Sequence, residues 1–257
     1  MRGGGEMASA AARLLFLAGF KVLVLERAQP LAVRRLVSFA QAVSDGGVEV
    51  EGVTGRRAMA SDLAPWPADV VPVIVDPEGS SLSRLGPGAV IDARMAKRNL
   101  GSARSDAPLV VGLGPGFVAG DDVHAVIETQ RGPNLGAVIW TGSALADTRL
   151  PAPVQGVGEE RVLRAPRAGR FRGLVPIGAL VSRGEAVAEV EGEPVRAEVG
   201  GLVRGLLADG VAAEVGLKIG DIDPRGPAVD PARISDKARA VAAGVLEAVV
   251  VGLVVRK

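Results

Sequence analysis

The sequence predicts an α/β protein in which a mainly parallel sheet is followed by a smaller all-β domain. Three observations lead to this prediction. Short segments rich in Val and Ile alternate with helical or Gly/Pro-rich segments through the first 150 residues. A glycine-rich turn, an amphipathic segment and an apolar strand open the chain. Residues 165–190 match residues 197–222 at a constant offset of 32, which indicates a duplicated unit.

The opening segment has the order of a Rossmann unit. It reads Gly-x-Gly-x-x-Ala from Gly3 through Gly5 to Ala8, then a helix, a strand and the acid Glu26. In such a unit the first two glycines let the backbone approach a pyrophosphate, and the small third residue seats the helix on the sheet. The acid holds a ribose hydroxyl. We therefore expect Gly3, Gly5, Ala8 and Glu26 to contact a cofactor, in a Rossmann-like domain.

The strand that normally opens such a unit is missing, because only Met1 and Arg2 precede Gly3. A start upstream of Met1 is one explanation. A purely structural interpretation also stays open, in which the glycines only allow the helix and the strand to pack closely.

The rest of the first half alternates in the same manner. A helix is expected over Leu31–Ser44 and a short exposed strand over Val48–Arg56. Further strands are expected over Val70–Val75, Ala89–Asp92, Leu109–Gly112, Val123–Glu128 and Gly136–Trp140. Strands of this composition between helices indicate a doubly wound sheet.

Two loops that follow buried strands predict a site for a polyanion. The first loop carries Arg94, Lys97, Arg98 and Asn99, and the second carries Gly112, Gly114 and Gly116. Both should emerge at the same edge of the sheet, where an anion would pair with the cations and with backbone N–H groups. The alternatives are a solvated helix face, since the cations have i, i+3, i+4 spacing, and a tight structural turn.

A third segment carries the single histidine of the chain. Alternation along a strand places His124 and Glu128 on the same face, so they are candidates for a proton-transfer or polar recognition pair. The alternative is a structural histidine.

The second half contains the duplicated unit. Its matched glycines are Gly169 and Gly201, Gly178 and Gly210, and Gly184 and Gly216. We expect them at turns, and we expect the copies to pair about a pseudo-two-fold axis. The spacing resembles the lipoyl or biotinyl carrier module, a barrel-sandwich hybrid, over about residues 161–225. The joining hairpin, Val190–Arg196, contains no lysine, so we expect this domain to dock a partner and to carry neither lipoyl nor biotinyl group.

These observations divide the chain into four parts. We expect a nucleotide- or anion-binding domain over 1–150, a linker over 151–160, the hybrid domain over 161–225 and a C-terminal helix and tail over 226–257. The apolar segment Ala238–Val255 contains Glu247, so we interpret it as an Ala-rich helix packed on the body and expect no membrane span.

Composition excludes several classes of function. The chain has 257 residues with 30 basic and 29 acidic side chains, a balance that predicts no nucleic-acid partner. Cysteine is absent, which excludes disulfides, thiolate nucleophiles and cysteine-ligated metal centres. No metal site is expected. The start of the chain lacks the apolar segment of a signal peptide, so we expect a cytoplasmic protein.

Several of these segments, taken together, resemble one family. They are Glu26–Arg35, Asp92–Gly101, Gly112–Phe117, His124–Thr129 and Lys218–Gly226. They are similar to the YqeB-type accessory family of selenium-dependent molybdenum hydroxylases, over nearly the whole chain. The resemblance implies a maturation factor that assists enzymes with a molybdopterin cofactor and handles a pterin or nucleotide ligand. The expected partners are a molybdenum hydroxylase or another maturation factor.

The leading hypothesis is therefore an accessory factor that binds a nucleotide-like or molybdopterin-type polyanion. Two alternatives stay open. One is an NAD(P)-dependent oxidoreductase built on the opening glycine turn, and the other is a non-catalytic scaffold whose glycines and arginines are structural. The ligand is thus a molybdopterin-type dinucleotide, NAD(P) or neither.

Overall fold

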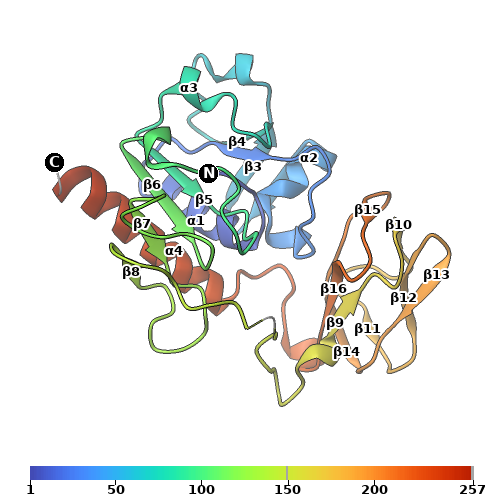
Figure 1. Ribbon diagram of the computed structural model, residues 1–257. Helices are drawn as coiled ribbons and strands as arrows, with labels where there is room; N and C mark the ends of the chain where they lie inside the picture. The colour runs from blue at the N-terminus through green and yellow to red at the C-terminus, as the bar shows by residue number, and fades with distance from the viewer. Residues whose placement is uncertain (149, 256–257) are drawn as a thin grey trace.

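The computed structural model describes residues 1–148 and 150–255 and has a mixed α/β fold with two lobes (Figure 1). The larger lobe contains two four-stranded sheets, ordered β2-β3-β4-β1 and β5-β6-β7-β8. Their strands are β1 (Val24–Glu26), β2 (Gly47–Val50), β3 (Val53–Arg57), β4 (Val71–Val75), β5 (Ala89–Asp92), β6 (Leu109–Leu113), β7 (Ala125–Ile127) and β8 (Val138–Ile139). Pairing is parallel except between β2 and β3 and between β7 and β8. The mainly parallel character expected for this half is confirmed.

The first residues of the chain join these two sheets. Arg2 forms parallel bridges to Leu25 of β1 on one side and to Asp92 of β5 on the other. Its N–H donates to Ile91 (2.8 Å), and the N–H of Gly3 donates to Leu25 (2.7 Å). The expectation of a missing strand was wrong, because these residues fill its position between β1 and β5.

Two helices cover one face of this joined sheet. They are α1 (Glu6–Leu17) and α4 (Asp236–Val250), and they pack against each other over one hydrophobic core (Figure 1). The expectation of an Ala-rich C-terminal helix packed on the body is confirmed, and α4 continues into a π-helical turn over Val251–Val255. Among the described residues, no helix has both the length and the hydrophobicity needed to cross a membrane.

The helix expected over Leu31–Ser44 is broken into short pieces. These are two 3₁₀ turns, η1 (Arg35–Val37) and η2 (Phe39–Gln41), and the single turn α2 (Ala42–Asp45). Tertiary hydrogen bonds cause the break. The N–H of Phe39 donates to Ser9 Oγ (2.7 Å), and the N–H of Ala40 donates to the carbonyl of Gly4 (2.9 Å). The remaining helix is α3 (Leu82–Leu85), also one turn long.

The smaller lobe consists of two antiparallel four-stranded sheets, ordered β13-β12-β10-β15 and β9-β16-β14-β11, around a common core. Their strands are β9 (Val162–Arg164), β10 (Gly169–Gly173), β11 (Leu180–Val181), β12 (Ala186–Val190), β13 (Glu193–Arg196), β14 (Gly201–Leu206), β15 (Ala212–Ala213) and β16 (Lys218–Asp223). The offset of 32 residues maps β9, β10, β11 and β12 onto β13, β14, β15 and β16. The two sheets are therefore equivalent, and each contains two strands from either copy.

The matched glycines have matched backbone conformations. Gly184 and Gly216 have φ of 87° and 77°, a region that favours glycine. Gly169 and Gly201 both have φ of 155° and open β10 and β14, so they lie in strands and not at turns. A Cβ would overlap the Glu191 side chain at Gly169 and the backbone of Asp223 at Gly201. The duplication predicted from the sequence is thus present in the backbone. The equivalent sheets show no closed barrel.

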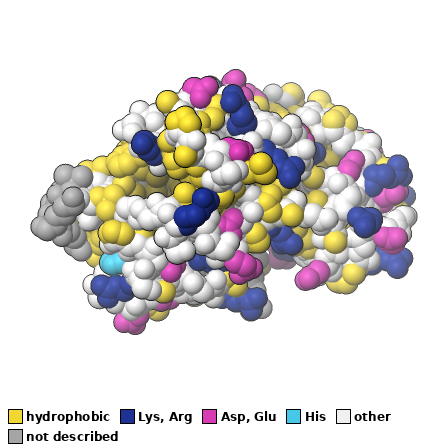
Figure 2. All heavy atoms as spheres, turned by 90° about the horizontal axis from the view of Figure 1, so that it is seen from above, with side chains coloured by type: hydrophobic (Ala, Val, Ile, Leu, Met, Phe, Trp, Pro, Cys, Tyr) yellow, Lys and Arg dark blue, Asp and Glu magenta, His cyan; other side chains and the backbone are white. Residues whose placement is uncertain are grey.

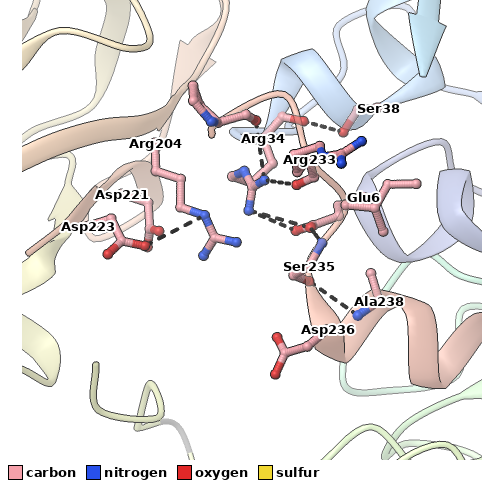
Figure 3. A network of polar contacts seen from close by, with 12 residues as sticks. Glu6, Arg34, Ser38, Arg204, Asp221, Asp223, Arg233, Ser235, Asp236 and Ala238 are labelled. Carbon is pink, nitrogen blue, oxygen red and sulfur yellow. Dashed lines mark hydrogen bonds and ion pairs between the residues drawn. The ribbon is translucent and has the colours of Figure 1, made fainter. Parts of the chain in front are cut away.

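A polar network around Arg34 lies where the lobes meet (Figure 3). The guanidinium of Arg34, whose residue is 8% exposed, donates to the Glu6 carboxylate (3.4 Å) and to the carbonyls of Pro231 (3.3 Å) and Arg233 (2.9 Å). Glu6 also accepts the N–H of Ser235 (2.9 Å), which is the N-cap of α4. Arg34 therefore ties the start of α1 to the segment that enters α4.

The same segment contacts the smaller lobe directly. Arg35 Nε donates to the carbonyl of Leu206 at the end of β14 (2.8 Å). A Cβ at Gly205 would lie 2.6 Å from the carbonyl oxygen of Val33, so glycine permits this close approach. The sheet that contains β14 and β16 is consequently the one that faces the larger lobe.

Candidate functional site

A cavity of about 1190 Å³ lies where β1 and β5 end, between the larger lobe and β16. Its walls include the glycine turn Gly3–Gly5, Glu26 and Arg94 from the larger lobe and Lys218 from the smaller lobe. The joined sheet changes winding direction at this point, and open α/β sheets bind their ligands there. This cavity is the candidate functional site.

The three glycines of the turn have different surroundings. Gly3 has φ of 92°, and a Cβ there would lie 3.2 Å from the backbone of Ala93. A Cβ at Gly4 would lie 2.8 Å from the backbone nitrogen of Ala40. Gly5 has φ of −68°, and a Cβ there would have no neighbour within 4 Å. Packing explains the first two glycines, whereas Gly5 only leaves the cavity open.

Gly5 is also the N-cap of α1, and no side chain caps this helix end. The N-terminal end of a 12-residue helix presents N–H groups and partial positive charge, both of which favour an anion. Ala8 is fully buried in the core under this first turn, as the expected role of seating the helix requires.

Glu26 holds the glycine turn in place. Its carboxylate accepts the N–H of Gly4 and the N–H of Arg27, both at 2.8 Å. Burial raises the pKa of Glu26, and these two hydrogen bonds offset only part of that effect. The Glu26 carboxylate thus already accepts one N–H of the glycine turn. The sequence did not predict this role for Glu26.

Arg94 lies at the edge of the cavity but is paired with a buried acid. Its guanidinium binds Asp92, with Nε at 3.0 Å from Oδ1, and Ser102 Oγ donates to the same carboxylate (2.7 Å). Burial alone would raise the pKa of Asp92, but the hydrogen bonds from Arg94 and Ser102 outweigh burial and lower it. Arg2 donates to Ser102 Oγ (2.9 Å) and completes this network behind the cavity.

The other residues of the cationic loop lie outside the cavity. Lys97 has φ of 62°, so the loop is not helical, and its Nζ lies 3.9 Å from Asp147. Arg98 is exposed. Asn99 closes its own turn through hydrogen bonds with the backbone of Ser102. The three cations that the sequence predicts for one anion site are therefore separated, because Arg94 borders the cavity and the side chains of Lys97 and Arg98 do not.

The second glycine loop is close to the cationic loop, as expected. The space beside each of its glycines is occupied by other atoms of the protein. A Cβ at Gly112 would overlap the ring of Phe117, and one at Gly114 would lie 2.5 Å from Thr129 Oγ1. Gly116 has φ of 105°, and a Cβ there would lie 2.5 Å from the backbone nitrogen of Arg98. Each of the three glycines therefore has a structural reason.

His124 and Glu128 do not form a pair. They lie at opposite ends of β7, roughly 13 Å apart along an extended chain. His124 Nδ1 accepts the N–H of Val110 (2.9 Å), and burial together with Arg104 lowers the pKa of His124. The Glu128 carboxylate accepts the N–H groups of Gln130 (2.7 Å) and Leu145 (2.8 Å). Both residues support local backbone.

A second cavity of about 380 Å³ has mostly apolar walls, including Leu15, Trp66 and Leu85. Figure 2 shows hydrophobic side chains gathered around a hollow on the upper face, while Lys and Arg alternate with Asp and Glu over the rest of that view. The walls of this cavity carry none of the residues that the sequence predicts for a site.

Several charged residues of the cavity were not candidates in the sequence analysis, among them Arg34 and Lys218. Arg34 lies in the segment expected to be a helix, where its charge resembles that of a solvated face. Lys218 is the only lysine between residues 161 and 225. Its isolation was the one signal that could have been used.

No protein-family model matches the chain. The chain is 49% identical over 250 residues to the uncharacterized protein YqeB of Escherichia coli (strain K12), and the match covers 96% of this chain and 46% of that protein. The chain thus spans a little under half the length of this relative. The likeness supports the YqeB-type resemblance and carries no information on molybdenum hydroxylases.

Two solved structures show short likenesses. An aspartoacylase family protein from Mesorhizobium loti is 13% identical, with a TM-score of 0.24 over 33% of this chain and 27% of that chain. The ectoine utilization protein EutE (DoeB) from Ruegeria pomeroyi, with product bound, is 22% identical, with the same TM-score and the same coverage. A TM-score this low does not establish a shared fold.

Proposed function

We propose that this chain, which is similar to a part of YqeB, is a maturation factor for selenium-dependent molybdenum hydroxylases. In this proposal it binds a nucleotide-like or molybdopterin-type polyanion in the cavity beside Gly5. The larger lobe then serves as a Rossmann-like binding domain. The smaller lobe serves as a hybrid-like domain that docks the hydroxylase or another maturation factor.

The observation that carries this proposal is the open position of Gly5. A glycine with an ordinary φ and no neighbour is not required for folding, yet it lets a ligand approach the N–H groups at the start of α1. Phosphate-binding turns use glycine in this way.

The size and charge of the cavity fit a large charged ligand. Ligand sites commonly measure about 300–1000 Å³, and this cavity is slightly larger. Its cationic side chains are Arg27, Arg34, Arg94 and Lys218, and its acidic side chains are Glu6, Glu26 and Glu78. The cations and the N-terminal end of α1 suit phosphate.

The NAD(P)-dependent oxidoreductase is less well supported. Glu26 would have to bind a ribose, but both of its carboxylate oxygens already accept backbone N–H groups. His124, the proposed acid or base of that reaction, lies at the far end of β7 from the strand ends that form the cavity. The scaffold alternative explains Gly5 only as the N-cap of α1.

Native mass spectrometry of the purified protein tests the proposal first. The three hypotheses predict a copurified pterin dinucleotide, a copurified nicotinamide cofactor and a protein without ligand.

The variant Gly5→Thr tests the role of the open glycine. Threonine is about as good an N-cap as glycine, so the free energy of unfolding should change by less than about 0.5 kcal/mol. Its side chain would fill the approach to α1, so the copurified ligand should be lost.

Gly88→Thr is a matched control, since a Cβ there has one distant neighbour and Gly88 lies outside the cavity. It should keep the ligand. Retention of the ligand in Gly5→Thr would contradict the proposal, and so would an empty parent protein that binds neither a pterin nucleotide nor a nucleoside diphosphate in calorimetry.

A further inference from the structure

We infer that Lys218 supplies a ligand contact from the smaller lobe, so that a phosphate-bearing ligand is held between β16 and the N-terminal end of α1. This inference rests on the proposed function and adds a binding residue to it. Lys218 opens β16 and lines the same cavity as Gly3–Gly5.

The charge around Lys218 is not balanced within the lobe. Its Nζ lies 2.9 Å from Asp221 Oδ1, and Arg161 Nη1 binds the same oxygen at 2.8 Å. Two cations thus share one carboxylate. The Asp221 and Arg161 side chains are 4% and 12% exposed, whereas the Lys218 side chain is 41% exposed. The surplus positive charge therefore lies on Lys218, the most exposed of the three side chains and the one that borders the cavity.

The duplicated unit provides an internal comparison. The offset of 32 residues places Lys218 on Ala186 and Asp221 on Glu189. Glu189 pairs with a single cation, Arg172 (2.7 Å), on the sheet that does not face the larger lobe. A second cation is present only in the copy that borders the cavity. The duplicated fold therefore does not explain the position of this second cation, Lys218, whereas the cavity does.

Arg34 adds buried positive charge to the same wall of the cavity. It also lines the cavity, it is 8% exposed, and its Nε has no hydrogen-bond partner. A buried N–H of a charged group without a partner is costly.

Calorimetry with inorganic pyrophosphate tests the inference on the full chain. Lys218→Ala should weaken pyrophosphate binding at least about tenfold, because the lost hydrogen bond joins two charged groups. Lys97→Ala removes the same charge outside the cavity and should leave the affinity within about twofold. The double variant Lys218→Ala with Ala186→Lys restores the net charge on the equivalent strand and should bind as weakly as Lys218→Ala.

The outcomes separate this inference from the proposed function. If Gly5→Thr abolishes pyrophosphate binding and Lys218→Ala does not weaken it, the cavity binds the anion and the inference is wrong. Recovery of affinity in the double variant would also overturn it, since net charge alone would then explain binding. If pyrophosphate does not bind the parent chain, both the proposed function and the inference are contradicted.

Discussion

The two glycine-rich turns of the larger lobe have similar sequences and different structural roles. In the loop from Gly112 to Gly116, every glycine borders an aromatic ring, a side chain or backbone that a Cβ would overlap. In the turn from Gly3 to Gly5, the last glycine borders only the cavity. Glycine spacing therefore does not distinguish a binding turn from a packed one, whereas the space around each missing Cβ does.

The largest effect should come from filling the packed loop. Gly116→Ala would force a left-handed backbone and an overlap with the backbone of Arg98, so the free energy of unfolding should fall by about 3 kcal/mol or more. Gly120→Ala is the control, because Gly120 has a similar φ of 99° and no neighbour within 4 Å. Strain alone should cost it about 1 kcal/mol. Urea unfolding measures both values, and equal losses would contradict this account of the loop.

The strands of the larger lobe were predictable because their signals are local. A run of Val and Ile over β4, β5 and β6 predicts these strands to within one residue, whichever partner they pair with. Arg2 lacked such a signal. It becomes a strand residue only because Leu25 and Asp92 lie on either side of it.

The site was less predictable because it depends on tertiary structure. Alternation placed His124 and Glu128 on one face of a strand, but all three residues of β7 are buried, and the two side chains flank its opposite ends. The contribution of Lys218 requires the smaller lobe to pack on the segment from Val33 to Arg35, which no local pattern indicates.

Two carboxylates beside the open turn should respond to pH in opposite directions. The pKa of Asp92 is lowered, so its stabilising contribution is present above the unfolded pKa of about 4 and is lost as the pH falls through the folded value. The pKa of Glu26 is raised, so its contribution is present below about pH 4 and is lost as the pH rises through the folded value.

Urea unfolding between pH 3 and pH 7 separates these contributions. In Asp92→Asn, the free energy of unfolding should fall less than in the parent as the pH is lowered below about 4. Glu26→Gln should gain stability relative to the parent as the pH rises from 4 to 7. Parallel stability curves for the parent and both variants would show that neither carboxylate titrates as its surroundings indicate.

The smallest effect is expected at Lys97, in the loop that packs against the closed glycine turn. Lys97 lies outside the cavity, its side chain is 40% exposed, and its ion pair with Asp147 is long at 3.9 Å. Exposed pairs of this kind contribute about 0–1 kcal/mol. Lys97→Glu should therefore change the free energy of unfolding by less than about 0.5 kcal/mol. It should leave the thermal stabilisation by pyrophosphate unchanged. A loss of that stabilisation in Lys97→Glu would mean that the ligand reaches the closed turn, and the two glycine turns would then belong to one site.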